Sequence, residues 1–343
     1  MMIRLSMGHV DEYDERVAAY AAQLGLGSVQ LHDPANLPAD RGYWAVSDLR
    51  ALRERCERDG LRLEGLENVP AAHFAKIQRG EPCRDEQIDN YRTTLRNMAA
   101  AGIQLLGYHF MCTYVWRTSM GAQGRGGARV SAFDLSRVSE GNALATYKLT
   151  PQPLAEPIDS DRMWANHQYF LDAVLPVAEE VGVRLALHPD DPPIDVALGG
   201  AARIFTSPVN LARALDQAHD SPAWGLNLCL GSVSEMGGQA AVDEVIDTFG
   251  PAGRICYVHF RDVAGQVPAF AECFLGEGNF DPVAVIRRLD GVGFDGFLID
   301  DHVPAVEGDM DTWGDTSPEA YCSRGRAHAI GYLQGVLSAL GHG

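Results

Sequence analysis

Four short apolar runs in the chain end on residues that commonly bind metal ions. The first three end on His188, Cys229 and His259, and the fourth is followed by Asp301. A short apolar run that leads into turn-forming residues is typical of a buried parallel strand that opens into a loop. Because active sites of parallel α/β folds form at the carboxyl ends of the strands, these four side chains are predicted to converge.

Imidazole, thiolate and carboxylate ligands together indicate a particular class of ion. They suit Mn²⁺, Fe²⁺, Co²⁺ or Zn²⁺ better than Mg²⁺ or Ca²⁺. Four protein ligands would still leave open positions on a six-coordinate ion, as metal-dependent catalysis requires. Singly, each histidine is also explained as a hydrogen-bonded residue and Cys229 as a small buried hydrophobe. Their joint placement on four successive strands favours the metal site.

Other polar residues follow predicted strands in the first half of the chain. His109 comes after the strand at 104–108 and is predicted to contact the substrate, and Glu67 and His32 occupy similar positions earlier in the chain. Any of these could instead satisfy backbone groups of the loops. Arg117 and Arg261 are predicted to bind an anionic substrate, because a guanidinium pairs with a carboxylate through two hydrogen bonds. The alternative for each arginine is an ordinary surface ion pair.

Predicted strands and helices alternate along almost the whole chain, as in repeated βαβ units. The strands are predicted near 2–6, 28–31, 61–66, 104–108, 184–188, 224–228, 254–259 and 296–299. The helices are predicted near 11–24, 46–59, 85–101, 161–181, 207–218, 239–250, 281–290 and 318–339. Eight of each predict an α/β fold of the (β/α)8, or TIM, barrel type. A doubly wound open sheet is the alternative.

The length of 343 residues is compatible with one domain, because α/β barrels of this size are common. We therefore expect a single TIM-barrel domain over 1–343, with long loops at the barrel mouth near 111–160 and 303–317. The first of these contains several glycines and little periodicity. A loop of that length is usually functional or disordered, so it is interpreted as a lid over the mouth or as a disordered segment.

The charge and the distribution of apolar residues exclude several classes of protein. A formal net charge of −18 argues against nucleic acid and anionic membranes as partners. The first residues lack the apolar core of a signal peptide, and no stretch approaches 18 uninterrupted apolar residues, so a cytoplasmic protein is expected. Seven cysteines without CxxC pairing also suit a reducing compartment. A homo-oligomer is expected because symmetric assemblies are common among soluble enzymes.

Several motifs resemble the mannonate dehydratases, which are metal-dependent barrels of the xylose-isomerase-like superfamily. The most specific is Arg184-Leu-Ala-Leu-His-Pro-Asp-Asp-Pro-Pro193. Further similar segments lie in the same order at 31–34, 88–103, 108–118, 225–232, 257–262 and 301–302. The resemblance covers about residues 30–340, and it independently implies a xylose-isomerase-like TIM barrel.

The resemblance implies that His188, Cys229, His259 and Asp301 bind a divalent ion, usually manganese. It also implies that His302 and a tyrosine in the following segment, here Tyr321, form the acid/base pair. The implied enzyme is a lyase that removes water from D-mannonate to give 2-keto-3-deoxygluconate. This reaction needs a base for the proton next to the carboxylate, an acid for the departing hydroxyl and a cation for the enediolate.

The chain departs from the family pattern around the expected substrate position. Val303-Pro304 replaces a glycine and an arginine, and His109 replaces an asparagine. The stretch 270–278 is more like the sugar isomerases and epimerases of the superfamily. Two alternatives therefore accompany the dehydratase: a metal-dependent isomerase, epimerase or eliminating lyase acting on a neutral or oxidised sugar, and a non-catalytic barrel that binds a sugar or a partner protein.

Overall fold

The computed structural model of the chain describes residues 2–138, 144–145, 154–309 and 323–342. Eight parallel strands form a closed barrel in the order β1-β14-β11-β10-β9-β4-β3-β2. Their bounds are β1 Arg4–Val10, β2 Ser28–His32, β3 Arg62–Glu67, β4 Leu105–Tyr108, β9 Arg184–Leu187, β10 Trp224–Cys229, β11 Ile255–Phe260 and β14 Phe297–Asp300. The structure confirms the predicted barrel and excludes the open sheet.

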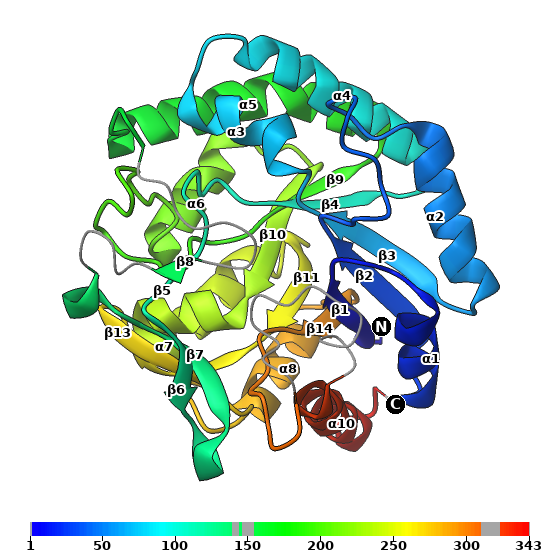
Figure 1. Ribbon diagram of the computed structural model, residues 1–343, viewed down its shortest axis with the longest axis vertical. Helices are drawn as coiled ribbons and strands as arrows, with labels where there is room; N and C mark the ends of the chain where they lie inside the picture. The colour runs from blue at the N-terminus through cyan, green and yellow to red at the C-terminus, as the bar shows by residue number, and fades with distance from the viewer. Residues whose placement is uncertain (1, 139–143, 146–153, 310–322, 343) are drawn as a thin grey trace.

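Helices surround the barrel strands on the outside, as Figure 1 shows. Their bounds are α1 Glu15–Gln23, α2 Val46–Arg58, α3 Ala71–Arg79, α4 Arg84–Ala100, α5 Ser160–Val181, α6 Pro208–Gln217, α7 Leu230–Phe249, α8 Pro282–Gly291 and α10 Arg324–Ala339. Every residue of β10 and β11 is buried, because the strands are covered on both faces. The two ends of the described chain lie side by side, and the backbone N–H of Ile3 donates to Nδ1 of His342 over 3.3 Å.

Two helices of the described structure differ most from the sequence prediction, and the predicted start of the last helix, at 318, lies outside the described residues. Helix α3 was not predicted, and α7 begins nine residues before its predicted start. Gly237 and Gly238 interrupt α7 with non-helical backbone angles, and Gly238 has a φ of +66° that side chains rarely adopt. The glycine pair obscured the first turns of the helix in the sequence, since glycine normally indicates a helix end.

Part of the first long loop forms a small sheet beside the barrel mouth. Strands β6 Ser119–Gln123 and β7 Arg129–Asp134 pair with the hairpin of β12 Asp262–Gln266 and β13 Ala269–Cys273, in the order β12-β13-β7-β6. A further pair joins β5 Trp116–Arg117 to β8 Leu144–Ala145. The expectation of a loop without regular structure was therefore wrong for these segments. Residues 139–143 and 146–153 of that loop lie outside the described structure.

A second apolar cluster holds this small sheet against the barrel. It consists of Trp116, Phe133, Ile194, Leu198, Val263 and Phe270, all of them buried. The other predicted loop is described as far as residue 309, and Ala305 within it exchanges backbone hydrogen bonds of 2.9 Å with Arg129. Within the described ranges, no helix is long and apolar enough to cross a membrane.

Candidate metal centre

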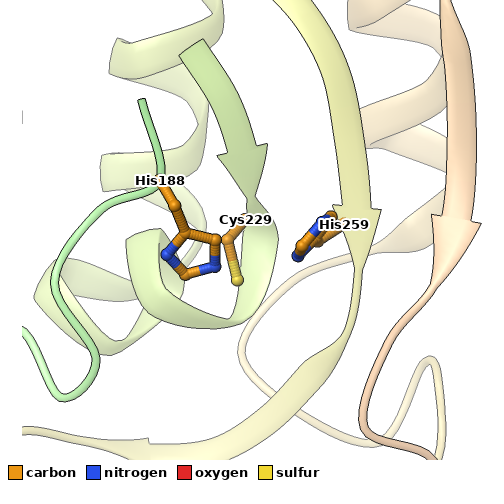
Figure 2. Close-up of side chains that lie close together, drawn as sticks. All are labelled: His188, Cys229 and His259. Atoms are coloured by element: carbon orange, nitrogen blue, oxygen red, sulfur yellow. The ribbon is translucent and has the colours of Figure 1, made fainter. Parts of the chain in front are cut away.

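Three predicted ligands lie together at the carboxyl end of the barrel. His188 directly follows β9, Cys229 ends β10, and His259 is next to last in β11. Cys229 and His259 are register partners across the two strands. One ligand atom of each side chain lies within 4.8 Å of those of the other two. Figure 2 shows the imidazoles of His188 and His259 on either side of the thiol. The structure therefore brings these three side chains together.

The two imidazoles are each held through the ring nitrogen that faces away from the cluster. Nδ1 of His188 lies 2.6 Å from the carbonyl oxygen of Pro189, which leaves Nε2 to bind an ion. Nε2 of His259 lies 2.9 Å from Oε2 of Glu67, which leaves Nδ1. Within the described structure this buried Nδ1 makes no hydrogen bond. Imidazoles that bind metals are usually fixed in this way, through the second nitrogen.

Glu67 at the end of β3 is the residue that orients His259. Its Oε2 also accepts hydrogen bonds from Oη of Tyr257 at 2.8 Å and from Nε2 of Gln30 at 3.0 Å. Its Oε1 accepts from Nδ2 of Asn227 at 3.2 Å. Burial would raise the pKa of Glu67, but His259 holds that pKa well below its ordinary value. Glu67 is therefore a carboxylate that fixes the ring of His259.

Cys229 has the surroundings of a thiolate. Ser232 Oγ donates to its sulfur over 3.4 Å, and Nη2 of Arg261 donates over 3.5 Å. Helix α7 begins at the next residue, so the positive end of the helix dipole points at the sulfur. Burial alone would raise the pKa of Cys229, but the charges of Arg261 and His188 lower it well below its ordinary value. These surroundings favour the thiolate form, which is the form that binds metal ions.

Asp301, the fourth predicted ligand, borders the three-residue cluster. Its Oδ2 lies 3.6 Å from Nδ1 of His259, and its Oδ1 lies 3.5 Å from Nε2 of His302. Burial would raise its pKa, but the charges of His302 and His259 lower it well below its ordinary value. Asp301 is therefore a carboxylate beside the cluster, where a small side-chain movement would bring it to an ion held by His259.

A cavity of about 150 Å³ opens beside the cluster. Its lining contains six histidines and five carboxylates: His9, His32, His109, His188, His259, His302, Asp11, Asp33, Glu67, Asp191 and Asp301. The described residues that line it include no lysine or arginine. An anion that enters this cavity must therefore be neutralised by something other than a basic side chain of the described lining.

His302, the predicted acid/base residue, lies in the lining of this cavity. Its Nδ1 is 2.7 Å from Oε1 of Glu272 and 3.0 Å from Nη1 of Arg261. Its backbone has a φ of +47°, which is uncommon for a residue other than glycine. The carboxylate of Glu272 therefore fixes the ring through Nδ1. Tyr321, the predicted partner, lies outside the described residues.

Arg117 and Arg261 lie outside the cavity lining, in a buried network of charges. Asp191 accepts hydrogen bonds from Arg117 at 2.5 and 2.8 Å and from Arg261 at 2.9 Å. Glu272 accepts from Arg117 at 3.1 Å and from Arg261 at 3.0 Å. A Cβ at Gly231 would lie 2.1 Å from Nε of Arg261, so the guanidinium needs a glycine there. The structure thus shows both arginines bound to carboxylates of the chain itself.

His109, the third predicted substrate contact, lines the cavity. Its Nδ1 accepts a hydrogen bond of 3.1 Å from the backbone N–H of Met111, so its proton is on Nε2. Burial lowers the pKa of His109 to about 3, which keeps the ring neutral at pH 7. The residue can donate one hydrogen bond to a substrate but cannot supply a positive charge.

A second group of potential ligands lies at the ends of β1 and β2. His9, Asp11 and His32 each offer one ligand atom within 4.8 Å of the other two. His32 was considered from the sequence, whereas His9 and Asp11 were missed. The predicted first strand ended at residue 6, but β1 continues to Val10. Extending the predicted first strand by four residues, to Val10, would have placed His9 and Asp11 at its carboxyl end and so at the barrel mouth.

Comparisons with known proteins agree on one family. The model of the family described as D-mannonate dehydratase (UxuA) matches residues 35–343. Mannonate dehydratase 2 of Halalkalibacterium halodurans is 33% identical over 319 residues, which cover 87% of this chain and 88% of the relative. Mannonate dehydratase of Thermotoga neapolitana is 31% identical over 330 residues, covering 87% and 86% respectively.

Solved structures give the same result. The crystal structure of mannonate dehydratase from Streptococcus suis serotype 2 matches with a TM-score of 0.80 and 26% identity, covering 99% of this chain and 95% of that chain. A D-psicose 3-epimerase from Clostridium cellulolyticum H10 matches with a TM-score of 0.58 at 14% identity, covering 98% and 99% respectively. The second match supports the barrel fold and nothing further about chemistry.

Proposed function

The chain belongs to the D-mannonate dehydratase family, and from this premise we propose that it removes water from D-mannonate to give 2-keto-3-deoxygluconate. One observation carries the proposal: His188, Cys229 and His259 meet at the carboxyl end of the barrel. The enzyme is accordingly a hydro-lyase with a sugar acid as its substrate. The alternative of a sugar isomerase or epimerase is not favoured, because relatives 31% and 33% identical to this chain are named as dehydratases.

The proposed metal ligands are His188, Cys229, His259 and Asp301. The donor set fits a divalent ion, since His259 keeps a buried nitrogen without a hydrogen bond in the described structure and Cys229 is held as a thiolate. We propose Mn²⁺, with Fe²⁺, Co²⁺ and Zn²⁺ able to take the same ligands. When bound, such an ion would polarise the substrate's carboxylate or adjacent hydroxyl and would offset the negative charge that develops next to the carboxylate.

His302 and Tyr321 are proposed to move the two protons of the elimination. The C2–H bond breaks as one residue of the pair takes the proton next to the carboxylate. The C3–O bond breaks as the other gives a proton to the hydroxyl, which leaves as water. The resulting enol then becomes the 2-keto acid. Glu272 supports this role, because its carboxylate holds Nδ1 of His302 at 2.7 Å and so fixes the ring beside the cavity.

His109 is proposed to bind a substrate hydroxyl through its Nε2–H. The two predicted arginine clamps are proposed to act one step away from the substrate. Arg117 and Arg261 both bind Asp191 and Glu272, and Glu272 in turn holds His302. Burial would raise the pKa of Glu272, but His302 first and then both arginines lower it, so the arginines help to hold the carboxylate that positions the proposed acid/base residue.

We also propose that the chain folds as a single domain over 1–343, forms a homo-oligomer and is located in the cytoplasm. Sedimentation measures the oligomeric state, and limited proteolysis measures how many stable domains the chain contains. Cell fractionation tests the location.

A panel of aldonic acids tests the reaction. Metal-loaded enzyme is expected to convert D-mannonate to a 2-keto-3-deoxy acid and to leave aldoses and ketoses unchanged. His188→Ala should lose both bound metal and activity, whereas His219→Ala changes an exposed histidine and should keep both. Isomerisation of a neutral sugar, without dehydration of any aldonic acid, would overturn the proposed reaction. Full dehydratase activity without bound metal would mean that catalysis does not depend on the proposed metal centre.

A further inference from the structure

The second group of ligands, at His9, Asp11 and His32, has the spacing of a cation site. Oδ1 of Asp11 lies 3.6 Å from Nε2 of His9 and 3.6 Å from Nδ1 of His32. These distances are too long for hydrogen bonds. Two ligands on one ion, each about 2.0–2.2 Å from it, are separated by roughly 3.0–3.5 Å. A small contraction of the group would therefore enclose a divalent ion.

Both imidazoles are arranged so that they can bind such an ion. The rings stack with centroids 4.2 Å apart and planes at 29°. Nε2 of His32 lies 2.8 Å from the side-chain amide of Asn68, and a half-turn of that amide lets its oxygen accept the Nε2 proton. The lone pair of Nδ1 is then available on the side of Asp11. On His9, Nε2 is the ring nitrogen that faces Asp11.

The charge of the cavity supplies a second, independent reason for a cation. The substrate of the proposed function is an anion, and the described lining contains five carboxylates without lysine or arginine. The positive charge of a divalent ion at the first site is already balanced by Cys229 and Asp301. Asp11 and Asp33 add further negative charge where the anion must bind. A second divalent ion would cancel the negative charge of Asp11 and Asp33.

Asp301 links the two groups of ligands. One of its oxygens lies 3.6 Å from Nδ1 of His259 in the first group. The other lies 4.0 Å from Nδ1 of His9 in the second. The two sites therefore flank the same carboxylate, and a substrate between them could contact both ions.

We propose that His9, Asp11 and His32 form a second divalent-cation site, and that the ion held there binds the carboxylate of the sugar acid. The geometry of the three residues carries the site itself. The charge argument and the choice of its ligand rest on the proposed function.

Metal stoichiometry tests the site without reference to activity. Protein stripped with chelator and then titrated with Mn²⁺ is expected to bind two equivalents by calorimetry and by elemental analysis after dialysis. His32→Ala and His188→Ala should each bind one equivalent, and the double variant none. The matched control His219→Ala should bind two. One equivalent in the wild-type protein, or two in His32→Ala, would overturn the second site, and the wild-type result does not depend on how the variants fold.

Substrate kinetics separate this inference from the proposed function. His32→Ala is expected to raise KM for D-mannonate at least about tenfold, because a charged contact to the carboxylate is lost. Its inhibition by the neutral polyol D-mannitol should stay unchanged. An unchanged KM for D-mannonate in a variant that has lost one ion would refute the carboxylate contact while leaving the dehydratase intact. Two bound ions without turnover of any aldonic acid would instead overturn the proposed function.

Discussion

Replacing Glu67 by glutamine should weaken metal binding although Glu67 is not itself a proposed ligand. Glu67 holds Nε2 of His259 at 2.9 Å and so directs Nδ1 of that ring toward Asp301. Glutamine keeps the size of the side chain but removes the charge. It also replaces one accepting oxygen by an NH₂ group. With its oxygen turned toward His259 and Tyr257, that NH₂ would face the donating NH₂ of Asn227.

The expected loss is about 10- to 100-fold in affinity for Mn²⁺. This corresponds to about 1.4–2.7 kcal/mol of binding free energy. The charge of Glu67 also raises the pKa of His259. Removing that charge therefore makes a proton compete less strongly with the metal ion for the imidazole. A divalent ion carries twice the charge of that proton, however. Losing the carboxylate therefore costs the ion more than it costs the proton, and affinity should fall.

Competition with a fluorescent chelator measures this affinity directly. The matched control is Glu57→Gln, which removes an exposed carboxylate that pairs with Arg53 on α2. The control should bind Mn²⁺ as tightly as the wild-type protein does. Circular dichroism should show that both variants are folded. A folded Glu67→Gln variant whose affinity stays within about twofold of wild type would refute the reasoning, because His259 would then need no carboxylate to orient it.

Three further predictions follow from the same contacts. Arg117→Met should lower the free energy of unfolding, measured by urea titration, by about 3 kcal/mol, because the buried carboxylates of Asp191 and Glu272 lose a partner. The control Arg125→Met removes an exposed ion pair with Glu277 and should change the free energy of unfolding little. His302→Asn should lower kcat by about 10²- to 10⁴-fold with bound Mn²⁺ unchanged, and a kcat near wild type would remove His302 from proton transfer. Burial would lower the pKa of His259, but Glu67 and Asp301 raise it well above its ordinary value, so the ion must displace a proton. Apparent Mn²⁺ affinity should therefore rise with pH between 6 and 8, and a flat profile would contradict a protonated His259.

The sequence predicted the barrel and its first ligands because both depend on local patterns. His188, Cys229 and His259 each end an apolar run, and parallel strands in a barrel must end on the same face. The role of Glu67 was not predictable in this way, because its partners Tyr257 and Asn227 come from distant strands. A glutamate after a strand has the same local pattern whether it binds solvent or a histidine.

The small sheet at the mouth and the buried arginines also depend on contacts between residues far apart in the sequence, which local patterns do not predict. Strand β7 pairs with β13, which is more than 130 residues away, so no local periodicity indicated the pairing. Arg117 and Arg261 were predicted from the sequence to bind an anionic substrate. In the structure both arginines instead pair with Asp191 and Glu272 of the same chain, which the sequence could not show. Such pairings depend on tertiary contacts that charge and spacing do not specify.

Absorption of the cobalt-loaded protein tests the central claim most directly. If Cys229 and the two histidines hold one ion, Co²⁺ protein should show a thiolate-to-cobalt charge-transfer band. Cys229→Ser should lose that band, and Cys273→Ser, at a partly buried cysteine outside the cluster, should keep it. A cobalt-loaded wild-type protein without the band, or a band that survives in Cys229→Ser, would contradict a metal centre at these strand ends.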